Sequence, residues 1–148
     1  MDRDYIISER FIWDDLLRRG EAVARRAKKI FDQQGSINTT ILSWPSKTIK
    51  GDDGKDINRI VALAVPKNIP IKRALIDMTK RTFPYALLLT EVQNDELKII
   101  LESHHGTRSW RFPIQRKGDV LRLGEGVTKD DVDSIGILWK RHASGVDS

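Results

Sequence analysis

The chain has 148 residues, of which 39% are hydrophobic and 32% are charged; this size and composition fit one globular domain and argue against disorder throughout. Its formal net charge of +5 and its isoelectric point of about 9.6 favour acidic partners such as nucleic acid. Because the chain contains no cysteine, disulfides, thiolate metal sites and cysteine nucleophiles are excluded.

The first predicted element is a long amphipathic helix from Ser8 to Gln34, followed by Gly35 as a stop residue. Its apolar stripe recurs at steps of three and four residues and consists of Trp13, Leu16, Gly20, Val23, Ala27 and Ile30. The opposite face is basic and carries Arg18, Arg25 and Lys29, flanked by Arg26 and Lys28. Residues 18–29 thus hold six positive side chains and only one negative side chain.

Strand signals dominate the next part of the chain. Residues 38–44 and 46–49 are rich in β-formers, and the turn-forming run 51–56 predicts the closure of a hairpin. Residues 58–66 are a nearly continuous apolar run, which predicts a central strand of the sheet.

A second helix is expected at roughly 70–82, with Pro70 in its first turn. Its inner face is predicted to be apolar and to consist of Ile71, Leu75 and Met78. Its outer face is predicted to be basic and to consist of Lys72, Arg73, Lys80 and Arg81.

The clearest β-signal is a meander over about 85–114. Asn94 and Asp95 form a good two-residue turn, which sets Val92 opposite Leu97, Thr90 opposite Ile99, Leu88 opposite Leu101 and Glu91 opposite Lys98. A second turn is predicted at His105 and Gly106. It would place Trp110 and Phe112 on the apolar face, opposite Leu101 and Ile99.

The last predicted elements are a short strand within 117–126, a short helix opened by Thr128 and a final strand at 135–141. The fold class is therefore α+β, a mostly antiparallel sheet with its meander packed against the N-terminal helix and the second helix. We expect a single domain at 1–142 and a flexible tail at 143–148.

Our first functional hypothesis is a non-enzymatic binding domain whose basic helix face contacts an acidic partner, either nucleic acid or an acidic protein surface. A second basic segment, 108–122, holds five cations and one acid around two aromatic residues, the ingredients of a surface that binds single strands. The contact residues expected from these two segments are Arg18, Arg25, Arg26, Lys28, Lys29, Arg108, Arg111, Arg116 and Lys117.

Two alternatives stay open. Glu91, Glu102, His104 and His105 hold the groups of a small hydrolase or a metal-dependent nuclease. A structural or assembly subunit would instead pair two copies through the apolar seam of the N-terminal helix.

The remaining expectations concern cofactors and location. We expect no metal and no cofactor, because the histidines are few and glycine-rich phosphate loops are missing. No apolar run reaches the roughly 20 residues of a membrane span, and the start of the chain does not read as a targeting segment. We therefore expect a cytoplasmic or otherwise intracellular protein that binds no membrane.

Overall fold

A computed structural model describes residues 2–46, 49–50, 56–57 and 60–131 of the chain. In chain order, its elements are α1 (Asp2–Gln34), β1 (Thr40–Pro45), β2 (Ile49–Lys50), β3 (Asp56–Ile57), β4 (Val61–Ala64), α2 (Ile71–Thr82), β5 (Pro84–Gln93), β6 (Glu96–Ser103), β7 (Gly106–Lys117), β8 (Val120–Leu123) and β9 (Val127–Asp130). The fold is α+β, as the sequence predicts, and every strand pair in the described part is antiparallel.

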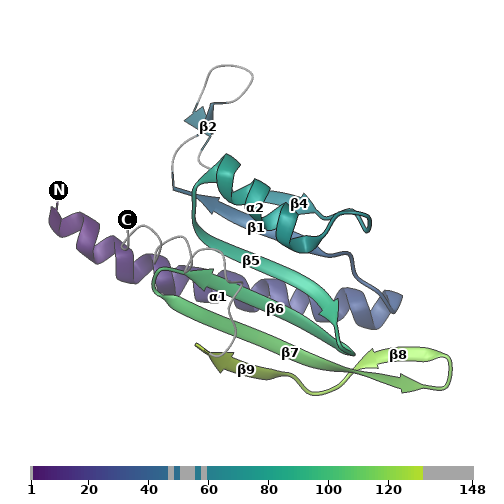
Figure 1. The fold of residues 1–148 in the computed structure, drawn as a ribbon. Coiled ribbons are helices and arrows are strands. Elements are labelled where there is room, and N and C mark those ends of the chain that lie inside the picture. The colour runs from purple at the N-terminus through teal and green to yellow at the C-terminus, as the bar shows by residue number, and fades with distance from the viewer. Residues whose placement is uncertain (1, 47–48, 51–55, 58–59, 132–148) are drawn as a thin grey trace.

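One seven-stranded sheet forms the middle layer of the molecule (Figure 1). Its strands follow in the order β4-β1-β5-β6-β7-β8, and β9 also pairs with β7. The predicted register of the first hairpin is confirmed, because Val92 lies opposite Leu97 and Glu91 lies opposite Lys98. The meander β5-β6-β7 therefore forms the centre of the sheet.

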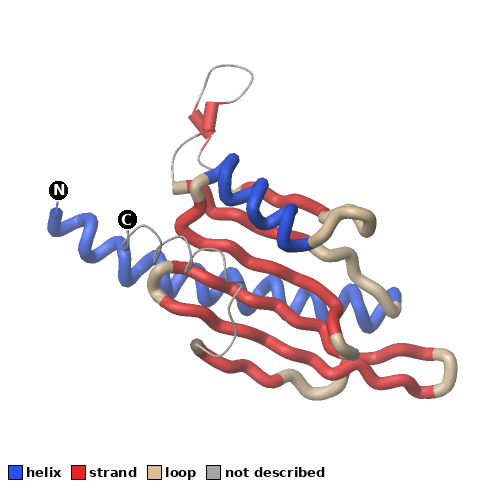
Figure 2. Tube along the Cα trace, viewed as in Figure 1, coloured by secondary structure: helices blue, strands red, loops and turns tan. Residues whose placement is uncertain are grey.

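The two helices cover opposite faces of this sheet (Figure 2). In the view shown, α1 runs behind the central and lower strands, and α2 lies in front of β1 and β4. The core on the α1 side is built around Leu16, Ala24, Ala27, Phe31, Leu88, Leu97, Ile99, Leu101 and Trp110. The smaller core under α2 is built around Ile41, Val65, Ala74, Leu75, Met78, Leu87 and Leu89. Alternation along β1 and β5 supplies side chains to both cores.

A close approach between Gly20 and Trp110 brings α1 onto the sheet. A Cβ atom at Gly20 would lie 2.5 Å from Cη2 of Trp110, so only a residue without a side chain fits there. The Trp110 ring is 3% exposed and packs with the helix stripe. Trp110 and Phe112 thus lie on the apolar face, as predicted.

The second helix agrees with its prediction. Pro70 precedes α2 in an extended conformation, and Leu75 and Met78 are buried while Ile71 packs against them. Lys72, Arg73, Lys80 and Arg81 are all exposed. In addition, β2 pairs with β3 across 51–55, as the predicted hairpin requires.

Two predictions, one for a strand and one for a turn, were wrong. The apolar run 58–66 contains β4, which is an edge strand rather than a central one, because among the described strands it pairs with β1 alone. Its exposed residues Ala62 and Ala64 are also apolar, so the run has the pattern of a fully buried strand although α2 covers only one of its faces. The second turn lies at His104 and His105, so Ile99 rather than Leu101 faces Trp110. The shift is by two residues, and side-chain facing is therefore preserved.

Residues 127–130 form strand β9, not the start of a helix. The free edge of β7 pairs with them, and this long-range pairing overrides the local capping pattern of Thr128. The helix α1 also starts earlier than predicted, at Asp2 instead of Ser8. The predicted strand at 135–141 and the predicted tail at 143–148 lie outside the described residues. Over the residues that were searched, no helix is long and apolar enough to cross a membrane.

Candidate functional site

The outward side of α1 is the first candidate surface. Leu16, Ala24 and Ala27 are buried against the sheet, and the opposite side of the helix carries exposed cations. We call this set the basic back of α1; it consists of Arg18, Arg25, Arg26 and Lys29. The side chain of Arg18 is 71% exposed. Lys28, which the sequence grouped with them, is half-buried on the flank of the helix.

Two acids of α1 are directed to the sheet instead of to the basic back. Oε2 of Glu21 accepts a hydrogen bond of 2.9 Å from Nε1 of Trp110. Oδ1 of Asp32 accepts one of 3.0 Å from the backbone N–H of Leu123. These carboxylates fasten α1 to β7 and β8, so their charges lie on a flank and do not alternate with the cations along the back.

A third acid, Asp15, lies close to the arginines at the start of the basic segment. Its carboxylate is 2.8 Å from Nε of Arg19 and 3.9 Å from a guanidinium nitrogen of Arg18. Arg25, Arg26 and Lys29 have no such acid within ion-pair distance among the residues that the structure describes. The positive charge of the back is therefore concentrated in its second half.

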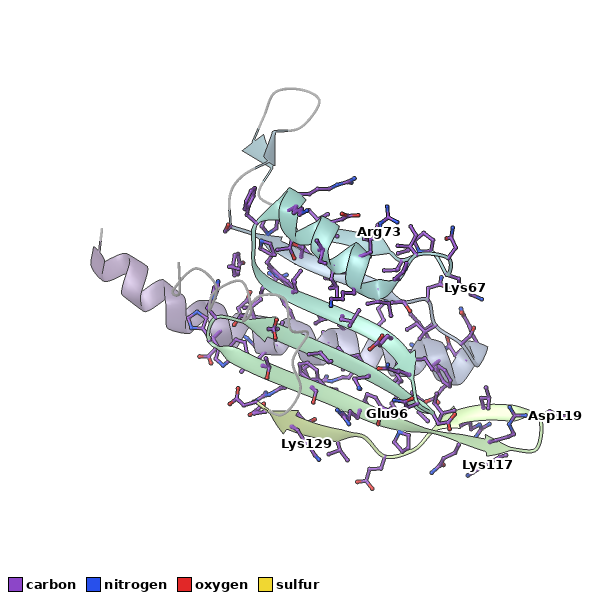
Figure 3. All side chains as sticks on the ribbon, in the orientation of Figure 1. Lys67, Arg73, Glu96, Lys117, Asp119 and Lys129 are labelled. Carbon is purple, nitrogen blue, oxygen red and sulfur yellow. The ribbon has the colours of Figure 1, made fainter. Side chains whose placement is uncertain are left out.

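The second basic segment does not form one surface. Arg108 makes two hydrogen bonds with the carboxylate of Asp130, at 2.6 and 3.0 Å, and this contact lowers the pKa of Asp130. Arg111 points to the other face of the sheet, where it lies 3.4 Å from Glu96. Arg116 and Lys117 are exposed and lie in the last two paired positions of β7 before the β7–β8 turn; Lys117 is labelled in Figure 3. Only this exposed pair resembles the predicted contact surface.

A cluster of charges lies on the face of the sheet that points away from α1. We call it the sheet-face cluster; it consists of Glu91, Glu96, Lys98 and Arg111. Glu91 is 8% exposed, and burial raises its pKa while the opposite Lys98 lowers it. Lys98 and Arg111 both approach Oε1 of Glu96, at 3.9 and 3.4 Å. The cluster is thus internally matched in charge.

Among the residues of the hydrolase or nuclease alternative, Glu91 lies apart from the other three. Glu91 and Glu102 do share a face, as predicted, but Glu102 follows the partner of Glu91 by four positions along β6. At strand rise, this corresponds to about 13 Å between the two carboxylate positions. His104 and His105 lie beyond the strand end, both exposed, and the His105 ring contacts Trp13 with centroids 6.2 Å apart. At this separation Glu91 cannot exchange a proton directly with Glu102.

Two further features bear on a metal site and on assembly of two copies. Within the described residues, no group of three His, Cys, Asp or Glu side chains is close enough to hold a metal ion. The apolar seam of α1 is buried against the sheet from Leu16 to Phe31 and is therefore already covered. A second copy could not use this part of the seam while the sheet remains docked.

Sequence reasoning missed two features. One is the role of Glu21 and Asp32, because their partners lie far along the chain. The other is a groove between β4 and α2; its only sequence signal is the short apolar run of β4 beside an amphipathic helix. No protein-family model, curated protein or solved structure matches the chain.

Proposed function

We propose that the protein is a binding domain whose basic back of α1 contacts the phosphates of a nucleic acid. The observation that carries the proposal is the segregation of charge around α1. Its apolar side is buried and two of its acids bind the sheet, while Arg18, Arg25, Arg26 and Lys29 face solvent. A surface of this kind attracts polyanions through release of their counterions.

The arrangement of these cations favours an extended polyanion over a small anion. Arg18 and Lys29 are eleven positions apart on one side of a continuous helix, which is about 16 Å along its axis. The cations therefore form a row instead of a pocket. A row matches the repeated charges of a nucleic-acid backbone, and contacts of this kind position a ligand without reading its sequence.

The proposal is tested by the salt dependence of binding. Random single-stranded and duplex oligonucleotides would be titrated with the full chain over a salt series, and log K plotted against log salt. The slope should be about −0.7 per phosphate contact on single strands and about −0.9 on duplex. Arg25→Ala should reduce the slope by about one unit for every sequence tested, because it removes one phosphate contact.

Arg111→Ala is the matched control for this titration. It removes the same charge and side-chain type, but from a residue that already lies beside Glu96. It should leave the slope unchanged. Absence of oligonucleotide binding even at low salt would reject the proposal and favour an acidic protein surface as the partner. Equal effects of the two variants would show that net charge, and not the basic back, controls binding.

A further inference from the structure

A groove of about 620 Å³ lies between strand β4 and helix α2, a volume typical of ligand sites. Apolar side chains form most of it, with Leu63 and Met78 among them and Ile69, 37% exposed, near its mouth. Its charged lining residues are Asp77 and Arg81. They are four positions apart and therefore on the same flank of α2. The groove is thus mostly apolar, with its charged side chains on the α2 wall.

The sheet edge beside this groove is open. β4 ends the strand order, and in the part of the chain that the structure describes no strand pairs with its outer edge. The N–H of Val65 donates to the carbonyl of Thr39 at 2.9 Å. Since backbone groups alternate in direction along an antiparallel strand, Val61 and Leu63 also direct their N–H and C=O groups to β1. The N–H and C=O groups of Ala62 and Ala64 consequently point away from the sheet.

The edge has few of the features that prevent pairing. Val61–Ala64 contains no charged residue and no proline, although the strand is short. An extended segment could therefore add to β4 through main-chain hydrogen bonds. Its alternate side chains would then point to the α2 side of the sheet, where the groove lies.

The charges around the groove decide which kind of strand can add to the edge of β4. The segment that borders the groove is basic: Lys67 lies in the loop after β4 (Figure 3), and Arg73 and Arg81 lie four positions before and after Asp77 on the same flank of α2. A second copy paired edge to edge would bring two such basic segments together, and like charges would oppose the contact. An acidic segment would instead be attracted to the same rim.

We propose that the edge of β4 and the adjoining groove bind an extended acidic peptide of a partner protein by strand addition. Ala62 and Ala64 supply the main-chain hydrogen bonds. Apolar side chains at alternate positions of the peptide enter the groove over Leu63 and Met78. One of these groove-facing positions carries an acidic side chain instead, and Arg81 on the groove wall contacts it. This surface is separate from the basic back of α1, which lies on the other side of the sheet.

The probe is a short fluorescent peptide of the pattern Val-Thr-Glu-Thr-Val-Thr-Glu, titrated against the full chain by anisotropy. In an added strand this pattern places Val and Glu on the same face, toward the groove. A peptide in which Lys replaces Glu is the charge control and should not bind. Arg81→Glu should weaken binding of the acidic peptide about tenfold or more, since it places like charge at the contact. Lys72→Glu makes the same change of charge at an exposed position of α2 that does not line the groove, and should change affinity less than about twofold.

A backbone variant tests strand addition separately from charge. Ala62→Pro removes an N–H that points outward and leaves the hydrogen bonds to β1 in place, since proline is tolerated on edge strands in this orientation. It should abolish binding of the acidic peptide, whereas Ala62→Ser, which keeps the N–H, should retain it. Circular dichroism and the thermal midpoint show whether each variant is folded, and the exposed Arg81 variant provides the decisive comparison if the proline variant is not.

Several results would overturn the proposal. These are no binding of the acidic peptide at millimolar concentration, equal binding of the basic peptide, equal loss in Arg81→Glu and Lys72→Glu, or undiminished binding by a folded Ala62→Pro variant. A dimer in sedimentation experiments that Ala62→Pro dissociates would identify a second copy as the occupant instead. Oligonucleotide binding is measured in parallel. Its loss or retention bears only on the basic back of α1.

Discussion

Arg25 on α1 and Arg111 on β7 both belong to strongly basic stretches of the chain, yet they lie in different electrostatic surroundings. Arg25 belongs to the basic back of α1 and is exposed, with no acid within ion-pair distance in the described part of the structure. Arg111 belongs to the sheet-face cluster, where Glu96 lies 3.4 Å away and Lys98 lies on the neighbouring strand. In the described part of the structure, the same kind of side chain thus faces solvent in one region and lies beside an acid in the other.

The geometry of the two elements explains the difference. On a helix an acid reaches a cation three or four positions away only if its side chain is not bound elsewhere, and Glu21, four positions before Arg25, is bound to Trp110 of the sheet instead. A sheet places residues of neighbouring strands directly opposite each other, so charges on one face are brought into pairs. A count of charges along the chain therefore predicts a binding surface only where the element keeps its cations apart from acids.

The largest expected effect comes from the contact that fixes the orientation of α1. Gly20→Val places a side chain where even a Cβ atom would lie 2.5 Å from Trp110, whose ring is buried. We expect the free energy of unfolding to fall by about 1–3 kcal/mol, the usual cost of overpacking a core. Urea denaturation followed by circular dichroism measures the change.

Ala22→Val is the control for this substitution, because Ala22 is an exposed position of the same helix. It should change the unfolding free energy by no more than about 0.5 kcal/mol. If Gly20→Val is as stable as the control, α1 is not seated against Trp110. The basic back would then have no fixed orientation.

A smaller effect separates the two regions directly. Arg111→Glu places an acid beside Glu96 within the sheet-face cluster, and should lower the unfolding free energy by about 1 kcal/mol. Arg25→Glu makes the same change of charge on the exposed back and should cost less than about 0.5 kcal/mol. Chemical denaturation of both variants in low salt compares them. Equal losses would contradict the distinction between matched and solvent-facing cations.

Local patterns predicted the parts of the fold that local physics controls. The period of Leu16, Ala24 and Ala27 identifies the buried side of α1 and hence its basic back, and the Asn94–Asp95 turn fixes the β5–β6 register. The fold class and α2 follow from the same signals. These elements could be predicted because each depends on residues close together in the chain.

Long-range pairing accounts for what the sequence did not predict. Strand β9 forms because β7 offers an edge, and Arg108 is matched because this pairing brings Asp130 to it. The edge position of β4 likewise depends on which strand lies beside β1. Apolar character alone does not distinguish an edge strand from a central one when its exposed side chains are alanines.

The smallest expected effect is a pH dependence within the sheet-face cluster. Burial raises the pKa of Glu91 above that of an unfolded chain, and Lys98 offsets this only in part. The folded state therefore holds its proton over a pH window in which the unfolded chain has released it, so stability should fall as pH rises from about 4.3 through the raised pKa. Glu91→Gln removes this dependence. Its stability relative to the wild type should be lowest at acid pH, where Glu91 is protonated in both states, and should rise through the window.

Glu125→Gln, at an exposed position, makes the same change of charge and serves as the control. Urea titrations at a series of pH values measure the difference. A gap between wild type and Glu91→Gln that stays constant with pH, or that follows the control, would show that the Glu91 carboxylate is solvated in the folded protein.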